Sequence, residues 1–482
     1  MAASALNTDK VSEFVEKAWS DSVVDTLSKY IEIPNQSPGF DPEWQTNGYQ
    51  EAAVDLLVNW VKEQNMLAGL TLEVIKEEDR TPLIFMEVAA FGEGARDETV
   101  LLYGHLDKQP PLTEFWAEGL HPHKPVIRDG KLYGRGGADD GYSIFAAVAA
   151  LGALQAQGMP HSRCVITIEA CEESGSKDLP HYIETLKERI GEVSLVVCLD
   201  SGCGNYKQLW LTSSLRGMMV GTLKVDVITE GVHSGAASGV VPSSFRILRH
   251  LLTRLEDPET GLITHPAFQC EVPPVRIEQA DKAAEVLGDE VWSLFPWCGD
   301  MRPAGTSNAD RLLAKTWKPA LSVTGVEGMP TLVAAGNVLR PYTAVKLSLR
   351  LPPNCNAEKA SVALKELLEK DPPYNARVSF TPEKCATGWE APAMVDWLQN
   401  AAASASETFY EGRPHQFIGE GGSIPFMGML GEKFPKAQFV ITGVLGPQSN
   451  AHGPNEFCHI QMSANVTKCV SYLVHAFSTR TD

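Results

Sequence analysis

The chain has 482 residues, which is too long for one ordinary hydrophobic core and predicts two domains. Hydrophobic residues make up 44% of the sequence and charged residues 21%, as is typical of a soluble globular protein. The formal net charge of −19 argues against nucleic acid and anionic membrane surfaces as partners, because both repel an acidic protein.

The sequence predicts a cytoplasmic location. Residues 1–10 lack the basic and apolar regions of a signal peptide, and no uninterrupted apolar run is long enough to cross a bilayer. The ten cysteines show no CxxC spacing. Several of them stand in apolar runs, so we expect reduced, buried thiols.

The N-terminal part of the chain predicts an α/β fold in which helices and strands alternate. Several of the strands are almost continuously apolar, which is typical of a mixed, mostly parallel sheet covered by helices on both faces. Helices are expected at 11–32, 48–66, 140–157 and 178–190, and strands at 70–75, 82–90, 98–104, 164–169 and 194–199.

A different pattern begins after residue 213. Polar and apolar residues partly alternate over 217–229, which predicts a strand with one face in water. The order of the predicted elements is that of an α+β, ferredoxin-like unit. These elements are the strand 217–229, helix 242–255, strands 321–326 and 342–351, helix 357–370 and strand 376–380. Residues 257–315 match no regular element.

The first pattern returns near the C-terminus. Residues 388–392 read as a linker, and a helix at 394–407, a strand at 436–442 and a helix near 461–478 follow. We therefore expect one discontinuous domain formed by 1–213 and 387–482. The second domain, 214–386, is inserted into it.

Five segments end apolar runs with side chains that bind metals. The candidate ligands are His105, Asp139, Glu173, Asp200 and His452. A mixture of imidazole and carboxylate ligands suits divalent ions that activate a water molecule. Hydrolysis is therefore the expected chemistry.

Two of these segments have a spacing that fits the chemistry of a metal site. His105 and Asp107 are two residues apart at a strand end, so they share a face and Asp107 can accept a hydrogen bond from the far nitrogen of His105. Taken alone, such a pair at a strand end is more often a surface hydrogen bond. Asp139 follows a glycine-rich turn, and its two oxygens can bridge ions about 3.5–4 Å apart.

Glu172 and Glu173 are adjacent acids, which repel each other unless water or cations neutralise them. A solvated loop is one interpretation. In the other, one glutamate binds metal while its neighbour takes a proton from water and passes it to the leaving amine.

Six motifs resemble, in the same order, those of the M20 family of dinuclear metallohydrolases, nearest to its cytosolic non-specific dipeptidase (carnosine dipeptidase-like) branch. The motifs are Gly104-His-Leu-Asp107, Gly134-Arg-Gly-Gly-Ala-Asp-Asp140, Glu172-Glu-Ser-Gly175, Val232-His-Ser-Gly235, Glu420-Gly-Gly-Ser-Ile-Pro425 and Ala451-His-Gly-Pro-Asn-Glu456.

The resemblance implies a division of roles around two ions, Zn²⁺ or Mn²⁺. It assigns His105 and Asp200 to one ion, Glu173 and His452 to the other, Asp139 to both, Glu172 as general acid/base and Asp107 as the residue that orients His105. It also implies a cis peptide bond between Asp139 and Asp140. The discontinuous domain would be catalytic, and 214–386 would be a lid and dimerisation domain.

The resemblance further implies a homodimer that hydrolyses a small peptide. His233 would reach the active site of the partner subunit and stabilise the oxyanion. Arg350 would bind the substrate carboxylate. Asn337, Gly422 and Ser423 would complete the carboxylate pocket.

Two departures from the family pattern lie near the expected site. Gly141 stands where the family's dipeptidases usually have lysine, and Lys108 stands where a small apolar residue is common. These departures leave the substrate open. A dipeptidase is the first expectation, and an N-acyl-amino-acid amidohydrolase or carboxypeptidase is the second. A catalytically silent metal-binding protein is the expectation from another class.

Overall fold

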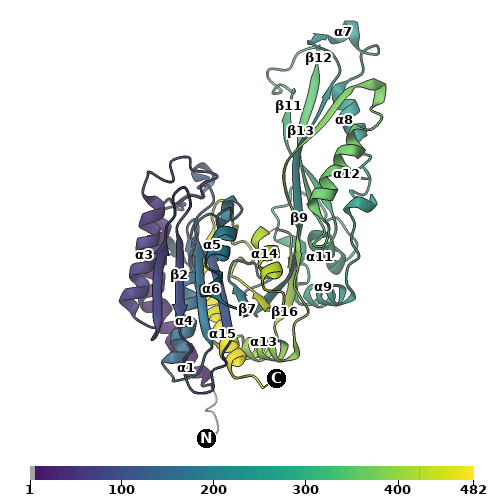
Figure 1. Cartoon of the computed structure of the whole chain (residues 1–482). Coiled ribbons are helices and arrows are strands. Elements are labelled where there is room, and N and C mark those ends of the chain that lie inside the picture. Colours follow the sequence, from purple (N-terminus) through teal and green to yellow (C-terminus); the bar gives the residue numbers. More distant parts are fainter. Residues whose placement is uncertain (1–5, 423, 482) are drawn as a thin grey trace.

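A six-stranded sheet forms the centre of the larger part of the molecule in this computed structural model, which describes residues 6–422 and 424–481 (Figure 1). The strand order is β1 (Leu70–Ile75), β2 (Leu83–Val88), β6 (Arg163–Glu169), β3 (Thr99–His105), β7 (Val193–Cys198) and β17 (Gln438–Ile441). The last four strands run parallel, whereas β1 and β2 add in antiparallel fashion at one edge. The predicted mixed, mostly parallel sheet is confirmed.

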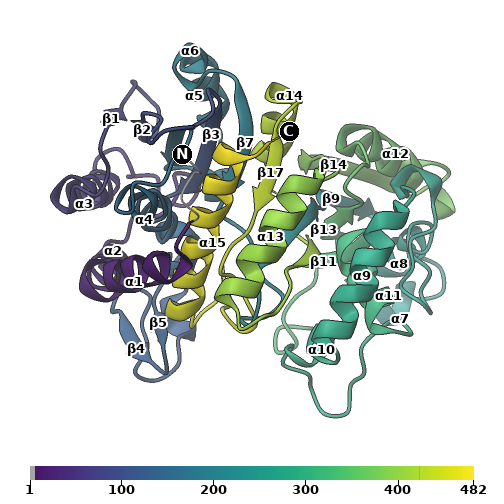
Figure 2. The ribbon, with the colours of Figure 1, turned by 90° about the horizontal axis from the view of Figure 1, so that it is seen from below.

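Helices cover both faces of this sheet because successive strand residues point to opposite sides. On β3, Val100 and Leu102 face one buried cluster, and Leu101 and Tyr103 face another. The first cluster includes residues of α1 (Thr8–Ala18), α2 (Val24–Glu32), α3 (Tyr49–Gln64), α4 (Ser143–Gln155), α13 (Asp396–Phe409) and α15 (Ile460–Thr479). The second includes residues of α5 (Leu179–Thr185), α6 (Lys187–Ile190) and α14 (Pro425–Lys433). Figure 2 shows α1, α4, α15 and α13 side by side.

A second, antiparallel sheet forms the long arm in Figure 1. Its strand order is β11 (Ala320–Glu327), β13 (Tyr342–Leu351), β9 (Gly217–Asp226) and β14 (Arg377–Ala386), with α8 (Ser244–Leu252) and α12 (Ala357–Glu369) packed on one face. Residues of β9 alternate between buried and half-buried, as the sequence predicts for a sheet with one wet face. The strand and helix order is ferredoxin-like.

The segment 257–315, which matched no predicted element, contains α9 (Pro274–Leu287), α10 (Glu290–Ser293) and α11 (Asn308–Thr316). Helices α9 and α11 pack against β16 (Gln416–Glu420), which belongs to a three-stranded sheet with β8 (Trp210–Leu215) and β15 (Trp389–Glu390). Arg276 of α9 forms a 3.1 Å salt bridge with Glu390 of β15. The segment therefore joins the arm to the larger part of the molecule.

We propose that the chain forms one domain from 1–213 with 387–482 and a second, inserted domain from 214–386. Strand β9 begins just after the first boundary, and β14 ends just before the second. The remaining elements are the turns η1 (Trp19–Val23), η2 (Thr113–Phe115), η3 (Gly137–Gly141), η4 (Glu172–Ser174), η5 (Pro266–Phe268) and η6 (Pro373–Asn375), the strands β4 (Val126–Arg128), β5 (Lys131–Tyr133), β10 (Val232–His233), β12 (Val338–Leu339) and β18 (Phe457–His459), and the helix α7 (Ser234–Ala237). Over the described part of the chain, no helix combines the length and apolarity needed to span a membrane.

Candidate metal centre

The predicted ligands come from five segments that meet at the carboxyl edge of the central sheet, where ligands usually bind in such folds. His105 is the last residue of β3, and Asp200 follows β7 by two residues. Glu173 lies in η4, just after β6. Asp139 lies in η3, directly before α4, and His452 lies in the loop after β17.

These side chains form two groups that share Asp139. In the first group, Nε2 of His105 lies 3.3 Å from Oδ1 of Asp139 and 3.9 Å from Oδ2 of Asp200. In the second, Nε2 of His452 lies 3.1 Å from Oδ2 of Asp139 and 3.3 Å from Oε2 of Glu173. Each carboxylate oxygen of Asp139 therefore faces a different imidazole.

The polar atoms of the two groups fit divalent cations. Oε1 of Glu173 is buried without a hydrogen-bond partner, which is costly for a polar atom. Burial raises the pKa of Asp200 to about 6 and raises the pKa of Glu173 well above its ordinary value. Carboxylates and imidazoles gathered in this way match the ligand preferences of Zn²⁺ and Mn²⁺.

The imidazoles of the site are held by carboxylates. Although burial opposes the shift, hydrogen bonding to Asp107 and Asp139 raises the pKa of His105 well above its ordinary value. Nδ1 of His105 lies 3.1 Å from the backbone oxygen of Asp107 and 3.4 Å from its Oδ1. These contacts occupy Nδ1, so Nε2 is the nitrogen that faces the two carboxylates of the first group.

Asp107 also fixes the turn that carries the two glutamates. Its Oδ1 accepts a hydrogen bond from the backbone N–H of Glu172 at 3.0 Å, and its Oδ2 accepts one from that of Glu173 at 3.1 Å. Sequence reasoning placed Asp107 beside His105 but missed this contact. Glu172 belongs to neither ligand group. Burial, and then the charge of Asp200, raises the pKa of Glu172 well above its ordinary value.

The glycine-rich turn is packed tightly against β3. The peptide bond between Asp139 and Asp140 is cis, as the family resemblance implied. Oδ2 of Asp140 accepts a hydrogen bond from the backbone N–H of His105 at 3.2 Å. A Cβ atom on Gly104 would lie 2.1 Å from Oγ of Ser143, so only glycine at this position lets α4 approach the strand so closely.

Arg135 and Glu456 connect the turn of Asp139 to the loop of His452, a role that sequence reasoning missed. Nη1 of Arg135 lies 2.7 Å from Oε2 of Glu456. Nη2 of Arg135 donates to the backbone oxygen of Gly453 at 2.8 Å. No local pattern could identify this pair, because its members lie 321 residues apart.

His233 and Asn337 lie together, but far from the ligand groups of their own chain. His233 is exposed and ends β10, which pairs with β12. The backbone N–H of Ser234 donates to the backbone oxygen of Asn337 at 2.9 Å. Figure 1 places β12 and α7 at the outer end of the arm.

Arg350 lies near the end of β13, whereas Tyr342 begins this strand just after β12. The two residues are roughly 26 Å apart along the strand at about 3.3 Å per residue. Burial, and then the charge of Arg350, lowers the pKa of the neighbouring Arg216 to about 10. Arg216 donates to the backbone oxygen of Gly421 at 3.3 Å. Gly422 is exposed beside this contact, and Ser423 lies outside the described residues. The structure thus brings Arg350 near the glycine loop and leaves Asn337 at the far end of the arm.

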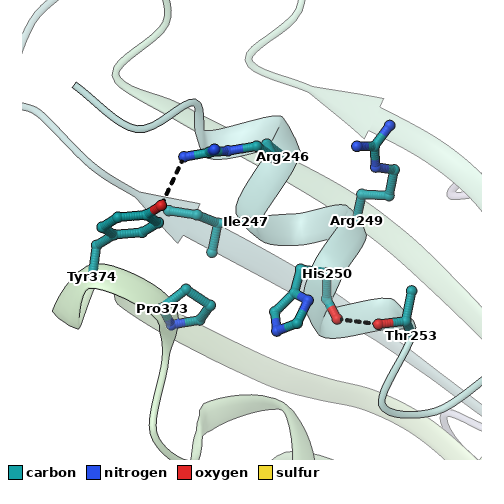
Figure 3. Close-up of a pocket in the computed structure, with 7 residues that line it drawn as sticks. All are labelled: Arg246, Ile247, Arg249, His250, Thr253, Pro373 and Tyr374. Carbon is teal, nitrogen blue, oxygen red and sulfur yellow. Dashed lines mark hydrogen bonds between the residues drawn. The ribbon is translucent and has the colours of Figure 1, made fainter. Parts of the chain in front are cut away.

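A cavity of about 400 Å³ lies on the helical face of the arm and contains none of the predicted site residues (Figure 3). Its lining is Arg246, Ile247, Arg249, His250, Thr253, Pro373 and Tyr374. Arg246 donates a 3.2 Å hydrogen bond to the hydroxyl of Tyr374, and Figure 3 shows Arg249 pointing in a different direction. The two guanidinium groups do not converge on a common point.

Comparison with known proteins agrees with the geometry. The family model described as peptidase family M20/M25/M40 matches residues 101–478. The cysteinylglycine-S-conjugate dipeptidase of Corynebacterium striatum is 28% identical over 433 residues, which cover 88% of this chain and 89% of that protein. The β-Ala-His dipeptidase of Homo sapiens is 25% identical over 446 residues, which cover 90% of this chain and 85% of that protein.

A solved structure has the same fold. The dipeptidase Dug1p from Saccharomyces cerevisiae superposes with a TM-score of 0.76 at 21% sequence identity, covering 99% of both chains. The family resemblance read from the six motifs is therefore confirmed. Because the family model spans most of the sequence, this chain belongs to the metallopeptidases of family M20/M25/M40.

Proposed function

We propose that the chain is a dipeptidase that uses two divalent metal ions to hydrolyse the peptide bond of dipeptides or similar small peptides. The observation that carries this proposal is the position of Asp139, whose two oxygens face His105 and His452 at 3.3 and 3.1 Å. The names of the two relatives above support the substrate class, since each names a dipeptide or a dipeptide conjugate.

In this proposal His105 and Asp200 hold one ion, Glu173 and His452 hold the other, and Asp139 bridges them. The ions would polarise the scissile carbonyl and lower the pKa of a water molecule. Zn²⁺ and Mn²⁺ are the proposed ions, since both accept mixed imidazole and carboxylate ligands.

Glu172 is the proposed general acid/base. It stands beside the ligand groups without joining them, which supports a role in moving protons. Its carboxylate would take a proton from the attacking water and give it to the leaving amine. Asp107 supports this role because it fixes the backbone of Glu172 through a 3.0 Å hydrogen bond.

Arg350 is proposed to bind the free carboxylate of the substrate, and Gly422 and Ser423 are proposed to complete the carboxylate pocket. The closeness of Arg216 supports this assignment, because two neighbouring guanidinium groups favour an anion between or beside them. An acidic metal centre and a cationic anchor together suit a small substrate with a free C-terminus.

His233 and Asn337 are proposed to act on the active site of a partner subunit in a homodimer formed through the lid. Their joint position at the outer end of the arm supports this role, since neither reaches the ligand groups of its own chain. The edge strand β11 supports the dimer, because Val323 and Val326 are 51% and 62% exposed there. The ten unpaired cysteines support a cytoplasmic location.

The test is a substrate panel with the metal-free protein reloaded with Zn²⁺ or Mn²⁺. We expect hydrolysis of dipeptides such as Cys-Gly and β-Ala-His in preference to tripeptides and N-acyl amino acids. A preference for N-acyl amino acids or for longer peptides would favour a deacylase or a carboxypeptidase. Stoichiometric metal without any hydrolysis would contradict the enzyme proposal.

Glu172→Gln tests the proton-transfer role in the same assay. We expect the variant to bind both ions and to lose on the order of 10²–10⁴-fold in turnover, as is typical for loss of a general base. Glu407→Gln, on an exposed part of α13, is the matched control and should keep wild-type turnover. Turnover of Glu172→Gln within tenfold of wild type would refute the assignment.

A further inference from the structure

Lys108 is a fully buried lysine that follows Asp107 directly. Its Nζ donates to the backbone oxygens of Tyr30 and Ile33, both at 2.6 Å, and lies 3.9 Å from the centre of the Tyr30 ring. Among residues 6–422 and 424–481, no carboxylate lies within salt-bridge distance of this ammonium group. Burying an amino group away from water is costly unless hydrogen bonds compensate, and the backbone oxygens of Tyr30 and Ile33 supply that compensation.

The contacts of Lys108 are reciprocated by the end of α2. The hydroxyl of Tyr30 donates to the backbone oxygen of Leu106, which lies between His105 and Asp107. The backbone N–H of Lys108 donates to the backbone oxygen of Asn35 at 3.1 Å. The segment that leaves β3 is therefore bound to Tyr30 of α2 and to the residues that directly follow this helix.

The aliphatic part of the Lys108 side chain also packs against the turn that carries Asp139. A Cβ atom on Gly136 would lie 2.5 Å from Cγ of Lys108. A Cβ atom on Gly141 would lie 2.3 Å from Cε1 of Tyr30. These two glycines flank Asp139, and the backbone N–H of Gly141 donates to the backbone oxygen of Gly136 at 3.0 Å. The lysine stem and the tyrosine ring thus occupy the space that side chains in the turn would fill.

We infer that Lys108 is a positioning residue that keeps His105 and Asp139 in register for metal binding. It does so by tying the end of β3 to α2 and by packing against the turn between Gly136 and Gly141. The two departures from the family pattern, Lys108 and Gly141, then belong to one arrangement: Tyr30 fills the space above Gly141 and carries the ammonium group of Lys108. This inference rests on the proposed metal centre but not on the proposed substrate.

Lys108→Met tests the inference because methionine keeps much of the stem and removes the ammonium group. The matched control is Lys468→Met. Lys468 is also nearly buried, but lies on α15 with its Nζ 2.7 Å from Oε1 of Glu16. Metal-free wild type and both variants are titrated with Co²⁺, whose visible absorption reports ligand geometry. We expect Lys108→Met to bind Co²⁺ roughly 10–100-fold more weakly with an altered spectrum, and Lys468→Met to match wild type.

Turnover adds a second readout. At saturating metal, Lys108→Met should lower kcat and leave KM for a dipeptide within about twofold, because Arg350 is untouched. Wild-type Co²⁺ affinity and spectrum in Lys108→Met would overturn the inference, and so would an equal loss in Lys468→Met. If wild type itself bound no Co²⁺, the proposed metal centre would fail as well.

Tyr30→Phe keeps the inference testable if Lys108→Met does not fold. This substitution removes only the hydroxyl that donates to the backbone oxygen of Leu106 and leaves the ring under the ammonium group. Weaker Co²⁺ binding with an altered spectrum is again the expected result. Co²⁺ binding that is identical to wild type would overturn the inference.

Discussion

Arg135 and Glu456 form a salt bridge in the protein interior, where their side chains are 1% and 0% exposed and the charged atoms lie 2.7 Å apart. The other carboxylate oxygen of Glu456 accepts a hydrogen bond from the backbone N–H of Gly136 at 3.0 Å. Arg135 in turn binds the backbone oxygen of Gly453, next to His452. One ion pair thus holds the two segments that present Asp139 and His452.

Glu456→Gln should destabilise the protein strongly, because it leaves the charge of Arg135 buried without a carboxylate to balance it. Breaking one side of a buried ion pair typically costs about 3–5 kcal/mol. Urea denaturation of the metal-free protein measures this loss. The control is Asp25→Asn, which breaks the exposed Lys29–Asp25 pair and should cost at most about 1 kcal/mol. Equal effects of the two substitutions would contradict the role given to the interior pair.

Asp107→Asn should displace the glutamate turn, because an amide nitrogen cannot accept a hydrogen bond from a backbone N–H. One of the two contacts to Glu172 and Glu173 is then lost. We expect kcat to fall roughly 10–100-fold while the protein stays folded. Asp257→Asn is the control, since Asp257 likewise accepts hydrogen bonds from two backbone N–H groups, both on Oδ1, but in the lid. Unchanged kcat in Asp107→Asn would argue against the turn-fixing role.

Stabilisation of the protein by metal should grow as pH rises from about 5.5 to about 7.5. Burial raises the pKa of Asp200 to about 6, so the folded, metal-free protein favours protonated Asp200. The folded, metal-free protein therefore loses stability as pH rises through about 6. Although burial opposes the shift, hydrogen bonding to Asp139 raises the pKa of His452, so the protonated imidazole is also favoured in the folded, metal-free protein. Cations must displace both protons.

Melting temperatures with and without Mn²⁺, taken at about three pH values in that range, measure the effect. The difference between the two melting temperatures should be smallest at the acid end. A difference that does not change with pH would show that protons and cations do not compete for these side chains.

Mixing two inactive variants should restore activity if His233 acts across a dimer. His233→Ala lacks the group offered to the partner, and Glu172→Gln lacks the proposed base. Under conditions of subunit exchange, half of the dimers are hybrids and each hybrid has one complete site, so roughly one quarter of wild-type activity is expected. Each variant incubated alone is the control. No recovery, with exchange confirmed by differently labelled subunits, would contradict the role in trans.

The elements that were predicted well are those whose own pattern of polar and apolar residues reveals the type of element. Buried strands such as β3 and β7 are nearly all apolar, and β9 alternates, so their environment is visible locally. Helix α9 was missed because only Arg276, Ala283 and Leu287 are buried along it. Its position depends on β16, more than a hundred residues later in the chain. Strands β8 and β16 and helix α14 were missed as well.

His105, Glu173 and Asp200 were predictable because each ends or closely follows an apolar strand, where a parallel sheet presents side chains. Contacts between distant segments were not. Lys108 reads as an ordinary strand-end lysine until Tyr30 is seen beneath its ammonium group. Asn337 was assigned to the same carboxylate pocket as Arg350. Within one chain the length of β13 separates the two residues, and only the three-dimensional structure reveals the contact of Asn337 with Ser234, the neighbour of His233.

If two cations bind as proposed, the shared carboxylate of Asp139 would make the two ion positions dependent on each other. With both filled, each cation feels the positive charge of its neighbour across one small anion. Once a chelator had withdrawn the first cation, the whole charge of Asp139 would act on the remaining cation, which would be held more tightly. Demetallation should therefore proceed in two stages, with a half-loaded species that outlasts mild dialysis.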